Sequence, residues 1–133
     1  MKEVKWIKIS TNISRDEKIR ALRGINKEFS WIWICLLSLA GKTNDDGLIY
    51  VTKDLPYSKR DLADYCGTTV VLITRALDAL VQYEMIEYER GFIQIINWYK
   101  HQNGEALEKK RDQDRERKQK ERKRIKEKIV TLP

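Results

Sequence analysis

Residues 58–97 have the sequence SKRDLADYCGTTVVLITRALDALVQYEMIEYERGFIQIIN, and the first half of this segment predicts two helices. A helix over residues 59–66 would begin after a capping serine and end at a glycine. A second helix would begin after Thr68 or Thr69 and run to about Tyr83. Its apolar stripe, with spacing i, i+3, i+4 and i+7, consists of Ile73, Ala76, Leu77 and Leu80. Two helices joined by a short turn that contains glycine are typical of a helix-turn-helix motif.

The second half of the segment predicts a β-hairpin. Residues 85–88 and 92–96 have strand composition, and the sequence Glu-Arg-Gly between them suits a hairpin turn. Upstream, residues 48–52 (LIYVT) follow a turn cluster and predict a third strand. A hairpin directly after the second helix defines the winged variety of the motif. The predicted fold class is therefore α+β, a winged helix-turn-helix with a three-stranded sheet.

The residues before this segment predict an arm and two more helices. Residues 4–10 (VKWIKIS) alternate apolar and polar side chains, which predicts a short strand or an extended arm. Ser14 and Glu17 have the spacing of a capping box and predict a helix that ends near Gly24. Residues 28–41 are apolar nearly all round, so we expect a helix buried on most sides and, at its remaining face, a dimer contact. The four tryptophans are expected in the core or an interface rather than as base-stacking platforms: Trp6, Trp31, Trp33 and Trp98.

Charge is unevenly distributed along the 133 residues. The net charge is +7, from 27 Lys and Arg against 20 Asp and Glu, which favours a polyanionic partner. Residues 105–128 hold 12 basic and 7 acidic residues, whereas residues 1–104 hold 15 and 13. We therefore expect a winged-helix domain over residues 1–104 and a basic helical tail or linker over residues 105–133. The tail suits three roles: a linker helix to a further domain, a clamp on the DNA backbone, or a partner-binding helix.

Other protein classes lack their signals in this sequence. The longest apolar stretch, residues 31–40, is about half a membrane span. A signal peptide is not recognisable, so we expect a cytoplasmic protein. Cys35 and Cys66 form no Cys-x-x-Cys pair, and Cys35 is expected to be a buried reduced thiol. His101 is the only histidine, and no nucleophile–base pair or Walker motif is present. We expect neither an enzyme nor a metal or cofactor site.

The predicted fold selects the residues that would face DNA. These are Lys59, Arg60, Thr69, Val70, Val71, Leu72, Thr74, Arg75 and Arg90. Arg75, Arg90 and the two basic residues at the start of the first helix would contact phosphates, and Thr69 would donate from its hydroxyl or from the helix N-terminus. The three apolar residues after Thr69 cannot read the hydrogen-bond code of bases, and an exposed apolar turn more often marks a protein contact.

Four stretches of the sequence resemble the N-terminal domain of phage replisome organisers. They are VKWIKIS, WIWICLLSLAGKTNDDGLIYVTKDLPYSKRDLADYC, RALDALVQYEMIEY and NWYKHQNGEALEKKRDQDRERKQKERKR. The resemblance covers roughly residues 3 to 125 and is most specific in AGK-ND-GLIY and NW-KHQN. These proteins initiate phage replication in Gram-positive hosts, and their N-terminal domain is similar to the winged helix of DnaD-like primosome proteins.

The resemblance implies several properties of this chain. It implies a winged helix that self-associates as a homodimer, binds double-stranded DNA at phage origin repeats and helps to recruit a host helicase loader. It also places a recognition helix at about residues 69–83 and a wing at about residues 85–96. Two departures stand out, because relatives carry polar residues where this chain has Val70 to Leu72, and because full-length organisers continue into a second domain. The chain is therefore expected to be either a fragment or a short stand-alone relative.

Three functions compete at this point. The first is a non-enzymatic DNA-binding module for replication initiation. The second is a protein-binding phage regulator or inhibitor that reuses the winged-helix fold. The third is a transcriptional repressor, which footprinting at a promoter rather than an origin would separate from the first.

Overall fold

The computed structural model describes the backbone of residues 4–131 and the side chains of residues 4–102 and 112–128. Its elements are η1 (Ile13–Arg15), α1 (Glu17–Ile25), α2 (Glu28–Thr43), β1 (Leu48–Ile49), α3 (Lys59–Cys66), α4 (Val70–Gln82), β2 (Ile86–Glu89), β3 (Phe92–Ile95) and α5 (Trp98–Thr131). The chain forms two compact units, residues 1–102 and residues 103–133. The fold class is α+β and winged-helix-like, as predicted.

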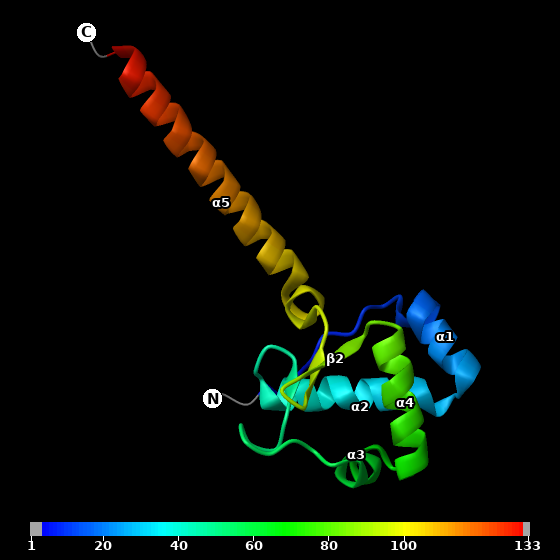
Figure 1. The fold of residues 1–133 in the computed structure, drawn as a ribbon. Coiled ribbons are helices and arrows are strands. Elements are labelled where there is room, and N and C mark those ends of the chain that lie inside the picture. Colours follow the sequence, from blue (N-terminus) through cyan, green and yellow to red (C-terminus); the bar gives the residue numbers. More distant parts are fainter. Residues whose placement is uncertain (1–3, 132–133) are drawn as a thin grey trace. The chain divides into compact units, whose positions relative to one another are not determined.

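Helix α2 is the central element of the first unit (Figure 1). Residues on most of its circumference are buried, which follows from the nearly continuous apolar sequence. It packs against α1, α3, α4 and the sheet within one copy of the chain, and the dimer contact expected at this helix stays a prediction. Among the large apolar residues of α2, Trp31 is the exposed exception, with a relative exposure of 57%.

The three strands form an antiparallel sheet in the order β1-β3-β2. Strand β3 pairs with β2 through Ile86 and Ile95 and with β1 through Leu48 and Gln94. Strand β1 is shorter than the predicted 48–52, because Val51 leaves the sheet and donates its backbone N–H to Leu55 O at 2.9 Å. The local turn over residues 51–55 therefore replaces the pairing that the sequence suggested.

The N-terminal arm, residues 4–10, contains no strand and runs along the first unit as an extended segment. The predicted cap of the following helix is wrong. Residues 13–15 form a single 3₁₀ turn, and Asp16 caps α1 by accepting a hydrogen bond from Ile19 N at 3.1 Å. Because the 3₁₀ turn occupies Ser14, its side chain does not cap the helix, and its carbonyl instead accepts from Arg23 Nη2 at 2.7 Å.

The tryptophans divide into two groups. Trp33 and Trp98 are buried, as expected, whereas Trp6 is 86% exposed and Trp31 is 57% exposed. Trp98 starts α5 earlier than the sequence indicated, since its ring packs beside Gly41 and Gly47 and fixes the first turn of that helix. A core position is therefore confirmed for Trp33 and Trp98 only, and an interface stays the prediction for Trp6 and Trp31.

The two cysteines are buried free thiols that form a hydrogen bond with each other. Burial is the main cause that raises the pKa of Cys66 to about 12, and the neighbouring Cys35 adds to it. A thiol whose pKa is raised on folding holds its proton more tightly in the folded state. Its contribution to stability is therefore complete below the unfolded pKa of about 8.5 and is lost as the pH rises toward the folded value.

We expect the melting temperature to fall as the pH rises from about 9 to about 12, and Cys66→Ala to weaken this fall. Thermal unfolding followed by circular dichroism at several pH values measures both. The tyrosines also ionise in this range, so only the difference between wild type and variant reports the thiol. Parallel declines would contradict the assignment.

Candidate nucleic-acid interface

The turn between α3 and α4 is built by side-chain caps, as the sequence predicted. Ser58 and Asp61 form a capping box at the start of α3, with Asp61 N donating to Ser58 Oγ at 3.1 Å. Gly67 closes the helix in the left-handed region at φ +69°. Thr69 then caps α4 by accepting from Leu72 N at 3.2 Å. The turn is short, and the direction of α4 is set within a few residues.

Helix α2 holds this turn in place from the other side. The indole Nε1 of Trp31 donates to Cys66 O at 3.0 Å, which satisfies a carbonyl at the end of α3. The hydroxyl of Thr68 donates to Glu28 Oε2 at 2.8 Å. The orientation of α4 therefore depends on contacts with the N-terminal half of α2 as well as on its own cap.

Helix α4 presents an outer stripe with i, i+4, i+7 and i+11 spacing. It consists of the exposed residues Val71, Arg75, Asp78 and Gln82. Two of the predicted DNA-facing residues are less exposed than expected. Leu72 is half-buried against the core, and the hydroxyl of Thr74 donates to Val70 O at 2.8 Å. Leu72 lies one turn before the buried Ala76, so it belongs to the edge of the core stripe rather than to the outer face.

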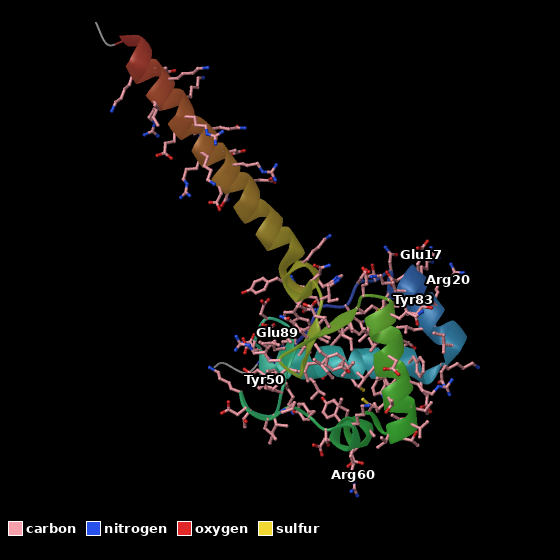
Figure 2. All side chains as sticks on the ribbon, in the orientation of Figure 1. Glu17, Arg20, Tyr50, Arg60, Tyr83 and Glu89 are labelled. Carbon is pink, nitrogen blue, oxygen red and sulfur yellow. The ribbon has the colours of Figure 1, made fainter. Side chains whose placement is uncertain are left out.

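The remaining predicted residues are exposed. Thr69 and Val70 lie at the start of α4, and Lys59 and Arg60 lie at the start of α3. In Figure 2 the Arg60 side chain points away from α3. The structure therefore places these side chains on the surface of one helix-turn-helix.

The wing is a tight hairpin whose tip is Arg90 and Gly91. Both have positive φ, +52° and +85°, as the two central residues of a type I′ turn require. Arg90 is exposed at this tip, and Glu89 on the preceding strand pairs with Phe92 across the hairpin. The wing thus has one basic residue at its end, where a backbone contact was expected.

The predicted DNA-facing surface lies in a segment whose net charge is negative. Residues 58–97 contain four basic and six acidic residues, so their net charge is −2. Glu87 and Glu89 are exposed on β2. Burial is the larger cause that raises the pKa of Tyr88, and the carboxylate of Asp78 adds to it. Any attraction of this chain to phosphates would therefore depend largely on basic residues outside this segment.

Two other regions carry the basic excess. The first is a group of exposed residues on η1, α1 and the following loop, which we call the α1 basic surface: Arg15, Lys18, Arg20, Arg23 and Lys27. Figure 2 shows Arg20 at the outer side of α1, beside Glu17. This surface was not among the predicted contacts, although five basic residues within 13 positions are a visible signal in the sequence.

The second basic region is the tail, whose residues up to Thr131 continue helix α5. Residues 118–126 hold six basic residues and one acidic residue, all exposed. They are distributed around the helix rather than along one face, because their spacing is irregular. Asp114 pairs with Arg117 at 3.7 Å, an i, i+3 contact on the surface of the helix. Such a helix suits contacts with phosphates that do not depend on base sequence.

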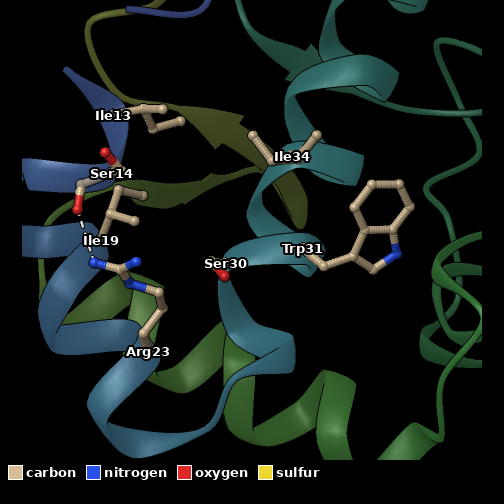
Figure 3. A pocket seen from close by; sticks show the side chains of 7 residues that line it. All are labelled: Ile13, Ser14, Ile19, Arg23, Ser30, Trp31 and Ile34. Atoms are coloured by element: carbon tan, nitrogen blue, oxygen red, sulfur yellow. Dashed lines mark hydrogen bonds between the residues drawn. The ribbon is translucent and has the colours of Figure 1, made fainter. Parts of the chain in front are cut away.

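A shallow hollow of about 280 Å³ lies between α1 and α2 (Figure 3). Its lining is mostly apolar: Ile13, Ser14, Ile19, Arg23, Ser30, Trp31 and Ile34. Its one charged group, Arg23, already donates to Ser14 O, so the hollow offers no cluster of polar groups for catalysis. Among the residues whose side chains are described, no group of His, Cys, Asp and Glu is arranged to hold a metal ion. Within the described part of the chain, no helix has the length and apolarity to cross a membrane.

Comparison with known proteins supplies the family. Searches of the curated proteins and of the solved structures give no match. Residues 6–123 match the family described as the N-terminal phage replisome organiser, and this range includes the arm, the helix-turn-helix, the wing and most of the tail. The match covers well over half of the chain and agrees with the resemblance seen in the sequence. The chain belongs to the N-terminal phage replisome organiser family, which gives it a role in phage replication.

Proposed function

We propose that this chain is a non-enzymatic DNA-binding module that acts in the initiation of phage replication. It would bind origin repeats in double-stranded DNA as a homodimer, in the cytoplasm of the infected bacterium, and would help to recruit a host helicase loader. The observation that carries the proposal is the family match over residues 6–123, which joins the helix-turn-helix to the replication role.

The geometry supports two kinds of interaction with DNA: local contacts from the helix-turn-helix, and long-range attraction from basic residues elsewhere. Helix α4 would enter the major groove with Thr69, Val71 and Arg75, and Arg90 would contact the backbone from the wing. Val71 is 68% exposed and suits contact with a thymine methyl group, which reads shape but no donor or acceptor. Because residues 58–97 carry net negative charge, the long-range attraction would come from the α1 basic surface and the tail.

Replacement of Arg75 and Arg90 by alanine is expected to weaken binding to the phage's own replication region by at least about ten-fold, because each arginine neutralises a phosphate. Gel-shift titration at two salt concentrations measures the affinity and its salt dependence. A matched variant, Lys42→Ala with Lys53→Ala, removes the same charge from exposed positions outside the helix-turn-helix and the α1 basic surface, and should have a smaller effect. Wild-type affinity in the arginine variant would reject these two contacts.

A second candidate is a protein-binding phage regulator on the same fold. Two observations favour it: the net charge of −2 over residues 58–97, and the exposure of Val70 and Val71, 44% and 68%. An exposed apolar pair within an acidic surface suits a protein contact. Capture of a host protein that depends on Val71, together with no measurable DNA affinity at low salt, would support this function over the first.

A further inference from the structure

The N-terminal arm is fixed to the first unit at two points. The side-chain amide of Gln102 accepts from Lys8 N at 2.7 Å and donates to Lys8 O at 3.0 Å, so it binds the arm as a neighbouring strand would. Ile7 packs on Gly41, where even a methyl group would lie 2.5 Å from Ile7 Cγ2. The arm therefore has a defined course beside the first turn of α5, although it forms no strand.

This course leaves the largest side chain of the arm in solvent. Trp6 is 86% exposed, although the arm is held in place at Ile7 and Lys8, which directly follow it. Lys5 and Lys8 flank it and are exposed. A buried indole contributes strongly to stability. The exposure of Trp6 on an anchored backbone therefore indicates that this side chain lies in a binding surface.

The neighbouring turn of α5 has the same character. Tyr99 is 53% exposed, and Lys100 and His101 are also exposed. Residues 4–12 and 98–102 contain no acidic residue. In the sequence, Glu3 precedes the arm and Glu105 follows the turn. Near Trp98, Asp45 already accepts a hydrogen bond from the Tyr50 hydroxyl at 2.6 Å.

Aromatic rings among lysines are the chemistry that binds single-stranded nucleic acid. An unpaired base stacks on an aromatic face, and its phosphates contact the cations, whereas bases in a duplex are already stacked on one another. A protein interface would be depleted in lysine at its centre. A bilayer would leave the backbone groups of an extended arm without partners.

We infer that the arm and the first turn of α5 form a binding surface for single-stranded nucleic acid, with a base stacked on Trp6 and phosphates held by Lys5, Lys8 and Lys100. This rests on the proposed function, since it adds a single-strand surface to a module that binds duplex DNA at the helix-turn-helix. The two surfaces use different residues, so their failures are separable.

The test is fluorescence anisotropy of a labelled oligothymidylate titrated with the full chain. Trp6→Ala is expected to weaken binding about 5- to 100-fold, and Trp6→Phe to retain most of the affinity, because a phenyl ring still stacks. Tyr65→Ala, which removes an exposed aromatic ring outside this surface, should bind like wild type. Since Trp6 is so exposed, its variants should keep the wild-type melting temperature.

Duplex binding measured in parallel separates the two proposals. Trp6→Ala should leave duplex affinity unchanged, and the Arg75 and Arg90 variant should leave oligothymidylate affinity unchanged. Wild-type oligothymidylate binding by Trp6→Ala would overturn the inference. It would also be overturned if that variant lost only self-association in sedimentation, or only binding to anionic vesicles, because the surface would then serve a second copy of the chain or a membrane.

Discussion

A variant with glutamine at six basic positions of the tail is expected to bind duplex DNA on the order of 100-fold more weakly at about 0.1 M salt, with a shallower salt dependence. The positions are Lys118, Lys120, Arg122, Lys123, Arg124 and Lys126. The reason is the charge distribution. Residues 58–97 carry net negative charge, whereas these six residues lie within nine positions that contain one acid. We therefore expect the tail to make more phosphate contacts than the helix-turn-helix.

Glutamine is the suitable replacement because its helix propensity is close to that of lysine and arginine. The length of α5 and its helical circular dichroism should therefore stay unchanged, and only charge is removed. Replacement of Asp112, Asp114, Glu116 and Glu121 by their amides provides the opposite control, since it raises the positive charge of the same helix and should tighten binding. Equal affinities for both variants and wild type would show that the tail does not contact DNA.

The helix-turn-helix was predictable because its signals are local. Ser58 and Thr69 each cap a helix through a backbone N–H three residues away, so the sequence around them suffices. The net charge of residues 58–97 could also be counted in the sequence. The charge was summed over residues 1–104, however, and the basic residues of α1 offset the acidic excess of this segment. The position of Leu72 follows from its spacing to Ala76, which places it at the edge of the buried stripe.

Contacts between distant segments were not predictable. The arm is anchored by Gln102, and nothing near Lys8 indicates that partner. The alternation in residues 4–10 suggested a strand, but a side-chain amide replaces the neighbouring strand. The exposure of Trp6 follows from that anchoring, so the residue that carries the inferred single-strand surface was assigned to a core or interface. The contact between Gly47 and Trp98 was not predictable either, because the sequence indicates only that Gly47 belongs to a turn.

Gly47→Ala is expected to lower the free energy of unfolding by about 3 kcal/mol, from roughly 1 kcal/mol of backbone strain and about 2 kcal/mol of overpacking. Gly47 has φ +87°, a conformation that favours glycine. An added methyl group would lie 2.7 Å from Trp98 Cβ and 2.9 Å from Ile95 O, and the latter is a backbone atom. Gly47 O also accepts from Ile95 N at 2.8 Å, so the segment cannot move away without loss of that bond.

Two other glycines separate strain from crowding. Gly91 has a similar φ of +85° but open space around it, so Gly91→Ala should cost only about 1 kcal/mol of strain. Gly24 lies within α1, with open space and ordinary φ, so Gly24→Ala should stabilise the chain by about 0.5–1 kcal/mol. Urea denaturation measures all three. If Gly47→Ala and Gly91→Ala cost the same, Trp98 does not crowd Gly47, and the first turn of α5 is not fixed by this contact.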